Sequence, residues 1–595
     1  MVTRPQDSPL PNQPAEPPPE PPVRFTALRG AALLAQPALN KDTAFSPDER
    51  RELELEGLLP AAVETIEQQV RRVWDGFRRL ADPLARYAYM SALRQRNLTL
   101  FHRFLQEHID AVLPVVYTPT VGAVIETFSH TDLPPAQGLY LTPDLLPQLS
   151  ELLRRAAPDG VDLLLVTDSE GILGIGDQGI GGIHICQGKL AVYTLCAGLN
   201  PERVLAVTLD VGTDRASLLS DPLYPGLRRR RLRGEAYDAV LDGFVAAVAA
   251  VFPGAFLHWE DFGSPQARRV LDRYRERLPS FNDDIQGTSV VATAAVLAAC
   301  RGQGGRLEDQ RIVIFGAGTA GCGIAKRLLR RLQAQGLTFE EARSRIWAID
   351  RQGLLLENQD SLSPPARPYA RPAADGAGFE RDGEGRIGLL EVVRRVRPSV
   401  LIGTSAVAGA FTRAVVEAMA AGLREGQTSG ARRPVILPLS NPTALAEATP
   451  ADLIAWSGGR ALVASGSPFA PVLHQGHERP IGQCNNCFVF PGLGFACVAV
   501  GASTVSEAMI DAALGALVEQ IPASRDQELP LMPPMADSQR VGAAVAEAVA
   551  LAAVREGVAR RASTPEEARA WLRRARWHPS YRPLRPIMET TKEAP

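Results

Sequence analysis

Four acidic side chains lie in two short segments of the sequence. Glu260 and Asp261 follow the apolar run AFLHW, and Asp283 and Asp284 occur in SFNDDIQGT, just past a helical segment that could return the chain to the same sheet edge. Carboxylate oxygens without nearby cysteine or obvious histidine ligands suit a hard divalent cation, Mg²⁺ or Mn²⁺. Acids are also common at strand ends and helix caps, so these residues alone do not establish a metal site.

A glycine pattern supplies a second chemical signal. The strand-like RIVIF (Arg311–Phe315) is followed by Gly316, Gly318 and Gly321 and then by the helix-forming AKRLLRRLQAQ. In such a turn the first glycine permits the tight bend, the second lets the backbone approach a pyrophosphate, and the third allows close helix–strand packing. An ordinary tight turn is the weaker alternative. We therefore predict a dinucleotide site, and its presence strengthens the case for a metal.

The next strand, RIWAID, ends at Asp350, a candidate partner for an adenine ribose hydroxyl. An extra helix, FEEARSR, makes its spacing from the glycines longer than the usual ~20 residues. An acid there favours NAD, yet Arg351 could accommodate a 2′-phosphate. A second glycine pattern, residues 174–179, has no long helix after it until about Lys189, so we expect it to form a loop that lines a pocket.

Lysine is rare in this chain. Only four of the 64 basic residues are lysines: Lys41, Lys189, Lys326 and Lys592. Arginine stays protonated at workable pH, whereas a lysine in a dry or crowded site can give up its proton. Codon usage alone could produce this bias, but a lysine deep in an ordered region suggests a chemical role.

Other notable residues favour structural roles. Cys484 and Cys487 form a C-x-x-C without a second pair at zinc spacing. His184 and His258 flank the suspected pocket, and for each a structural histidine is the preferred interpretation. The run Arg228–Arg231 is expected to be a solvated surface or interface element, because the whole chain is rich in arginine.

The composition is that of a soluble globular protein, with 595 residues, 45% hydrophobic and 22% charged, and a net charge of −2. Near-neutrality argues against a general affinity for nucleic acid or anionic lipid. Seven cysteines make no dense disulfide framework, and no charged-then-apolar leader opens the sequence, so we expect a cytoplasmic protein. The apolar run 488–500 is too short to span a bilayer, which takes about 20 residues.

The elements that position these residues follow from the apolar patterns. Helical periodicity dominates up to about His130, and the strand-like runs VDLLLVTD, RVLAVTLDVG and AFLHWEDF then alternate with helical segments, which predicts a parallel sheet. The runs SVLIG, PVILPLS and ALVAS fit further strands of the glycine-turn unit. We predict a disordered proline-rich tail at 1–23, a helical region at 24–135, α/β domains at 136–280 and 281–538, and a helical segment at 539–595.

Taken together, these segments resemble the malic enzyme family. The segments that carry the resemblance are ALNKDTAFSPDER, LPVVYTPTVG, VTDSEGILGIGDQGIGG, GKLAVYT, LDVGTD, HWEDFG, FNDDIQGT, FGAGTAGCGIA, LSNPTA, ASGSPF and GQCNNCFVFPG. The resemblance implies an α/β fold with a Rossmann-type NAD-binding domain, whose last part from about 486 returns to an α/β substrate domain, and a helical N-terminal region. It also implies oxidative decarboxylation of L-malate to pyruvate and CO₂ with NAD and Mg²⁺ or Mn²⁺, in a homodimer or homotetramer.

The resemblance also implies roles for individual residues. A lysine with a lowered pKa would take the proton of the malate hydroxyl, and a tyrosine would later protonate C3. The roles are Lys189 as general base, Tyr117 as general acid, Glu260, Asp261 and Asp284 as metal ligands, Asp283 as the residue that orients the lysine, Asn441 and Asn486 as substrate contacts, and Asn441 as a cofactor contact too.

Some positions depart from the family pattern. Many malic enzymes have a substrate-binding arginine where this chain has Gly171, and whether Arg215 replaces that charge is open. The related malolactic enzymes, which convert malate to lactate and CO₂ with bound NAD⁺ and Mn²⁺, also have EGILG here. Malolactic activity is therefore the alternative function. A nucleotide-binding sensor without catalysis is a third, which the intact Tyr117, Lys189 and carboxylates disfavour.

Overall fold

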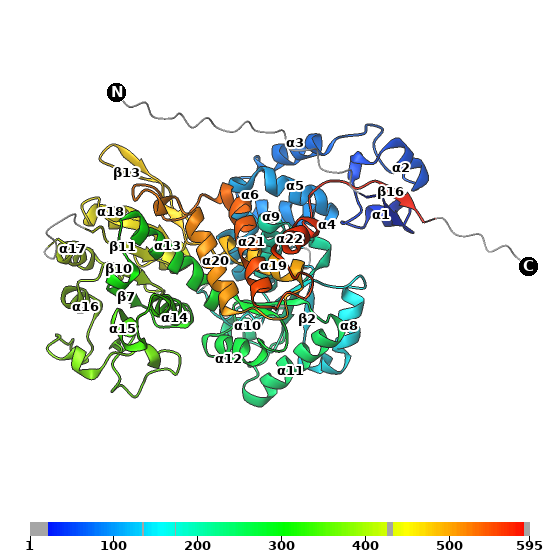
Figure 1. Cartoon of the computed structure of the whole chain (residues 1–595). Helices are drawn as coiled ribbons and strands as arrows, with labels where there is room; N and C mark the ends of the chain where they lie inside the picture. The colour runs from blue at the N-terminus through cyan, green and yellow to red at the C-terminus, as the bar shows by residue number, and fades with distance from the viewer. Residues whose placement is uncertain (1–21, 134–135, 173, 425–431, 588–595) are drawn as a thin grey trace, which may run out of the picture. The chain divides into compact units, whose positions relative to one another are not determined.

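The computed structural model describes residues 22–133, 136–172, 174–424 and 432–587 (Figure 1). The chain divides into two compact units. Unit 1 comprises Met1–Arg78, Leu93–Phe104 and Pro579–Pro595, and unit 2 comprises Arg79–Ala92 and Leu105–His578. The predicted tail at 1–23 lies outside the described residues, apart from its last two.

Unit 1 joins the first and last described strands of the chain. β1 (Arg24–Thr26) pairs in parallel with β16 (Leu584–Pro586). Both were missed by the sequence analysis, because each has only three residues and its partner lies at the other end of the chain. The unit also contains α1 (Gly30–Leu34), α2 (Pro47–Glu52) and α3 (Ile66–Phe77). Its core consists of Leu33, Phe45, Leu53, Leu55 and Leu584.

The first sheet of unit 2 has five parallel strands in the order β2-β4-β3-β5-β6. α8 (Leu149–Ala156), α11 (Gly234–Val251) and α12 (Ser264–Tyr274) pack on one face through a continuous apolar core. The predicted domain boundary after residue 280 falls inside β6, a three-residue strand without an apolar run. The strands are β2 (Leu139–Leu141), β3 (Leu163–Thr167), β4 (Val204–Leu209), β5 (Phe256–Trp259) and β6 (Ser280–Asn282).

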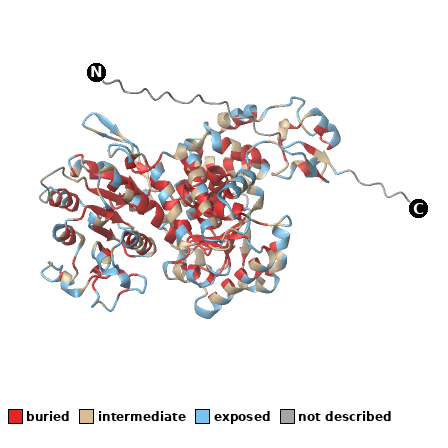
Figure 2. Cartoon of the chain, viewed as in Figure 1, coloured by how far each residue is buried: buried red, intermediate tan, exposed pale blue. Residues whose placement is uncertain are grey.

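The helix α9 (Ile183–Ala197) is buried along its whole length. It contacts β3 and β4 and is also contacted by α19 (Phe490–Val500) and α21 (Ser538–Arg555). Figure 2, in the same view as Figure 1, shows buried residues concentrated in these central helices and in the strands. Because α9 is buried on every side, its polar side chains are held away from bulk water.

The second sheet has seven strands in the order β15-β12-β11-β10-β7-β8-β9, and only β9 is antiparallel to its neighbour. α16 (Leu389–Val396), α17 (Arg413–Gly422) and α18 (Pro450–Trp456) share one core with it. Three strands predicted from SVLIG, PVILPLS and ALVAS are confirmed as β10, β11 and β12. The strands are β7 (Ile312–Phe315), β8 (Ile346–Asp350), β9 (Gly353–Leu354), β10 (Val400–Gly403), β11 (Val435–Pro438), β12 (Leu462–Ser465) and β15 (Gly482–Gln483).

Further helices and one hairpin belong to the two units. The helices are α4 (Pro83–Arg96), α5 (Leu98–Glu107), α6 (Ile109–Val116), α7 (Thr120–Thr127), α10 (Ala216–Ser220), α13 (Thr288–Gly302), α14 (Thr319–Ala334), α15 (Phe339–Ser344), α20 (Glu507–Gln520) and α22 (Pro565–Ala575), and β13 (Val472–His474) and β14 (His477–Arg479) form a hairpin.

Candidate active site

A pocket of about 360 Å³ in unit 2 is lined from both α/β lobes. Many of its lining residues lie in segments that follow the carboxyl ends of parallel strands, where open α/β sheets bind ligands. Of the residues expected to act in the site, the pocket is lined by Tyr117, Lys189, Glu260, Asp261, Asp284, Gly318, Asn441 and Asn486. The volume falls within the range typical of small-molecule sites.

Three carboxylates converge in this pocket. Glu260 and Asp261 follow β5, while Asp284 lies in the π-helical turn η5 (Asp283–Gly287) after the neighbouring strand β6. One oxygen from each lies within 4.8 Å of the others. The Asp261 backbone has φ of 53° and its N–H donates to Asp284 Oδ2 at 3.0 Å. A non-glycine residue in this strained region indicates a geometry enforced by its surroundings.

The carboxylates repel one another in a dry environment. Burial raises the pKa of Glu260 to about 7 and that of Asp284 to about 8, and the like charges of neighbouring acids add to both shifts. Glu260 is buried and Asp284 is half-buried, and two oxygen ligands that resist ionisation together fit a divalent cation, which would neutralise them.

Lys189 lies on the buried helix α9 and faces the carboxylates. Its Nζ donates to Glu260 Oε2 at 2.6 Å and to Asp283 Oδ2 at 2.5 Å, and only 3% of the side chain is exposed. The preceding Gly188 lets α9 pack closely against the end of α6, since a Cβ there would lie 2.7 Å from the Val116 carbonyl oxygen. Lys189 and Asp283 therefore meet as the resemblance implies.

The pKa of Lys189 corrects one expectation. Burial lowers it, but Asp283 and Glu260 outweigh burial and hold it well above its usual value. The predicted lowered pKa is wrong for this arrangement of charges, because sequence reasoning did not count the carboxylates around the ammonium. Burial likewise raises the pKa of Tyr117 well above its usual value, opposed by Lys189, so the Tyr117 hydroxyl keeps its proton.

Two asparagine amides are oriented by neighbours. Asn441 Oδ1 accepts from Ser467 Oγ at 2.6 Å, and Asn441 Nδ2 donates to the Leu439 carbonyl oxygen at 3.5 Å. Asn486 Nδ2 donates to Asp283 Oδ2 and to Thr288 Oγ1, each at 3.0 Å. The pocket therefore carries amide groups in fixed orientations beside its charges.

The glycine turn joins β7 to α14 as predicted. Gly316 has φ of 106°, a Cβ at Gly318 would meet nothing within 4 Å, and a Cβ at Gly321 would collide with the Gly316 carbonyl oxygen. These positions match the tight bend, the open backbone and the close packing expected of them. Asp350 ends β8, which pairs with β7, and its Oδ1 accepts from the Arg351 N–H at 2.9 Å.

Comparison with known proteins identifies the family. The family model for the malic enzyme N-terminal domain matches residues 94–275, and that for the malic enzyme NAD-binding domain matches residues 285–554. The chain is 47% identical to NAD-dependent malic enzyme 3 of Bacillus subtilis (strain 168), over 94% of this chain and 98% of that protein. The chain belongs to the malic enzyme family.

Further relatives agree with this malic enzyme assignment. The NAD-dependent malic enzyme of Edwardsiella ictaluri is 44% identical over 94% of this chain and 97% of its own length. The crystal structure of Entamoeba histolytica malic enzyme has a TM-score of 0.52 at 20% identity and covers 88% of this chain and 92% of that one. At this identity the structural match supports the fold alone, and it confirms the predicted α/β class.

The position without the family's arginine has no room for a side chain. A Cβ at Gly171 would lie 2.8 Å from the Phe262 carbonyl oxygen. Arg215 does not line the pocket; its guanidinium donates to Gln178 and, at 3.0 Å, to Ser217 Oγ. Among the described residues that line the pocket, Lys189 is the only lysine or arginine.

Arg231 was wrongly grouped with a solvated run. Arg228 to Arg230 are exposed, but the Arg231 side chain is buried. Its Nε and Nη2 donate to the two oxygens of Asp177 at 2.7 and 2.6 Å, and Nη1 donates to the Asp168 carbonyl oxygen at 2.8 Å. Arg231 thus ties the end of β3 to the glycine-rich loop. The spacing in the sequence gave no signal of this.

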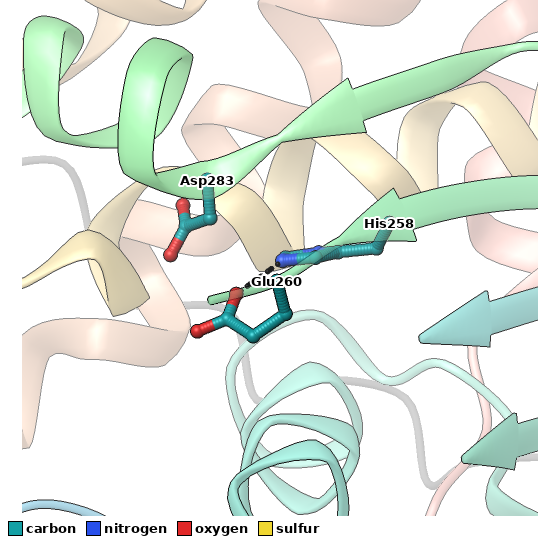
Figure 3. A group of neighbouring side chains, drawn as sticks. All are labelled: His258, Glu260 and Asp283. Carbon is teal, nitrogen blue, oxygen red and sulfur yellow. Dashed lines mark hydrogen bonds and ion pairs between the residues drawn. The ribbon is translucent and has the colours of Figure 1, made fainter. Parts of the chain in front are cut away.

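His258 is the other residue that sequence reasoning underrated. Figure 3 shows its ring beside Glu260 and Asp283, and the oxygen or nitrogen atoms of these three side chains lie within 4.8 Å of one another. A signal was available, because residues two apart on a strand share one face of the sheet. His184 is buried and hydrogen-bonds Tyr87, and Cys484 and Cys487 are free thiols, as the structural interpretation expects.

One described stretch, Ile109–His130, is long and apolar enough to cross a membrane, and half of its most apolar window is buried within the protein. It consists of the eight-residue helices α6 and α7 and a short 3₁₀ turn, with Tyr117 at the break between the helices. A transmembrane helix needs about 20 continuous residues, so we interpret this stretch as core helices that place Tyr117 in the pocket.

Proposed function

We propose that this chain catalyses the oxidative decarboxylation of L-malate to pyruvate and CO₂ with reduction of NAD⁺ and with a divalent cation. The observation that carries the proposal is the buried Lys189 Nζ, which contacts Glu260 and Asp283 in a pocket that also contains Asp261 and Asp284. An amine beside a cation-binding carboxylate group suits the deprotonation of an alcohol.

Glu260, Asp261 and Asp284 would hold Mg²⁺ or Mn²⁺, since all three present hard oxygen ligands to one point. When bound, the cation supplies acidity to the malate hydroxyl, stabilises the negative charge that develops as CO₂ leaves, and offsets the carboxylates that hold Lys189 protonated.

The chain's own residues would move two protons. As the neutral amine, Lys189 Nζ would take the proton of the malate hydroxyl, and Asp283 would keep the amine aligned through its hydrogen bond. The Tyr117 hydroxyl, which burial keeps protonated, gives its proton to C3 after decarboxylation. Asn441 and Asn486 orient the substrate, and Asn441 also contacts the cofactor.

Gly316, Gly318 and Gly321 would receive the pyrophosphate of NAD at the N-terminus of α14, and Asp350 would bind the adenine ribose hydroxyl. In support, Gly318 lines the pocket with open space above its backbone, and Asp350 lies at the end of the strand next to the glycine turn. We further propose that the enzyme is cytoplasmic and forms a homodimer or homotetramer. Light scattering on the purified chain tests the oligomeric state.

The test is incubation of the purified protein with L-malate, Mn²⁺ and NAD⁺. Pyruvate with stoichiometric NADH is the expected result. Malolactic activity is the second candidate, favoured by Gly171, and would yield lactate without free NADH. No turnover, with NAD⁺ still bound, would contradict both and support a sensor.

A further inference from the structure

His258 lies behind the carboxylate that Lys189 contacts. It is on β5, two residues before Glu260, and is fully buried. The rings of Tyr193, Phe281 and Phe490 surround its ring edge-on, with centroids 5.5 to 5.7 Å away. This enclosure leaves the imidazole little freedom to turn or to reach water.

Both ring nitrogens have a partner. Nδ1 lies 2.8 Å from the Tyr193 hydroxyl, and Nε2 lies 3.0 Å from Glu260 Oε2, the contact drawn in Figure 3. A carboxylate that faces an ammonium group accepts hydrogen bonds, so Nε2 carries the hydrogen and donates it. Nδ1 then accepts from Tyr193, which fixes the tautomer of the ring.

Glu260 belongs to two groups of side chains. Its oxygens contact Lys189 Nζ at 2.5 and 2.6 Å, and it also lies within 4.8 Å of Asp261 and Asp284. Rotation about the terminal torsion of a glutamate is soft, with a broad distribution. A further donor to Oε2 would hold the carboxylate in the rotation that serves an amine and a cation together.

We propose that His258 is a positioning residue, whose Nε2–H sets the rotation of the Glu260 carboxylate and whose own tautomer is set by Tyr193. The inference rests on the proposed function, in which Glu260 is a ligand of the cation. Outer partners of metal ligands typically contribute about 10- to 100-fold in metal affinity.

The protein contains a matched control. His184 is also a buried histidine whose Nδ1 meets a tyrosine hydroxyl, that of Tyr87 at 3.1 Å, and its ring packs against Phe128. Among the described residues its ring hydrogen-bonds this hydroxyl, whereas the ring of His258 also contacts a carboxylate. Loss of a buried imidazole is therefore common to His184→Phe and His258→Phe, and loss of a donor to Glu260 is specific to the second.

The experiment measures Mn²⁺ dissociation constants by electron paramagnetic resonance, with neither malate nor NAD⁺ present. His258→Phe is expected to weaken Mn²⁺ binding about 10- to 100-fold. His258→Gln keeps an N–H donor and should restore most of the affinity, and His184→Phe should bind Mn²⁺ like the wild type. Tyr193→Phe, which releases the tautomer, should weaken binding less than His258→Phe.

Wild-type affinity in His258→Phe, or an equal loss in His258→Gln, would overturn the proposal, because the ring would then act through packing alone. If His258→Phe does not fold, as judged by thermal unfolding, Tyr193→Phe and His258→Gln decide, and the loss must be larger in Tyr193→Phe. A wild type that binds Mn²⁺ without turnover contradicts the proposed function but not this inference. A wild type that does not bind Mn²⁺ contradicts the metal site and the inference with it.

Discussion

Each unit of the molecule contains a buried lysine beside a glutamate, and the two pairs differ in their balance of charge. In unit 1, Lys41 contacts Glu49, whose carboxylate also accepts the backbone N–H groups of Ser46 and Leu584. In unit 2, Lys189 contacts both Glu260 and Asp283, and further acids lie beside them.

The pKa values follow this balance. Burial raises the pKa of Glu49, but its hydrogen bonds from Lys41 and the backbone bring it below the usual value, and burial lowers the pKa of Lys41. Burial instead raises the pKa of Glu260 to about 7. An acid that is paired with a lysine and hydrogen-bonded by backbone N–H groups has a structural role. Where acids outnumber bases, the carboxylates repel one another in the folded protein, and a bound ligand can relieve that repulsion.

The largest contrast should come from Lys189→Arg. Arginine keeps the charge but cannot give up its proton, so turnover of malate should fall by about 10³-fold, the scale of a lost general base. Mn²⁺ and NAD⁺ binding should persist. Lys41→Arg is the matched control and should keep kcat near the wild-type value, measured as NADH formation. Equal kcat in the two variants would remove Lys189 as the base.

Glu49→Gln tests the structural pair. It leaves the buried Lys41 charge uncompensated, which should reduce the free energy of unfolding by about 3 to 5 kcal/mol. Urea unfolding, followed by tryptophan fluorescence and by circular dichroism, measures the loss. A cost within error of zero would mean that the pair is not a stabilising contact.

His184 extends the contrast to a buried base that meets a hydroxyl instead of a carboxylate. Burial lowers its pKa from 6.5 to about 4. Between these two pH values the imidazole is protonated in the unfolded chain and neutral in the native state. Its contribution to stability is present above pH 6.5 and is lost as the pH falls toward 4, by about 3 kcal/mol. His184→Phe should remove this part of the pH dependence in denaturant titrations at pH 7.5 and pH 5. An unchanged difference between the two pH values would contradict the assignment.

Asp284→Asn tests the excess of acidic over basic side chains around Lys189. Removing one like charge should leave the metal-free protein at least as stable as the wild type. The rise in Tm with Mn²⁺ should disappear, a loss of about 2.7 kcal/mol of stabilisation at 100 times the dissociation constant. Thermal scans with and without Mn²⁺ measure both effects, and a metal-dependent rise that survives would exclude Asp284 as a ligand.

Local patterns were predictable from the sequence. Capping boxes begin α2 at Ser46 and α15 at Thr338, and the two partners of each lie three residues apart, within one helical turn. The glycine turn after β7 is local in the same way. The site residues Lys189 and Tyr117 came from family resemblance, since nothing in their local sequence indicates that they would share a pocket.

Non-local contacts were not predictable. The burial of Arg231 depends on Asp177 in a distant loop, and the pKa direction of Lys189 depends on acids contributed by other segments. The strand pairing of unit 1 joins segments with no sequence pattern in common. In each case the interaction that decides the outcome is made with residues far along the chain. Composition and periodicity carry no information about such contacts.

That strand pairing has a consequence for synthesis. β1 receives its hydrogen-bonding partner only when residues 584–586 have been translated. The hydrogen bond from the Leu584 N–H to the Glu49 carboxylate also cannot form before then. Domains generally fold in the order in which they leave the ribosome, N-terminal first. Here the earliest-made unit is completed last, so a nascent chain arrested before residue 584 should leave its N-terminal region sensitive to protease.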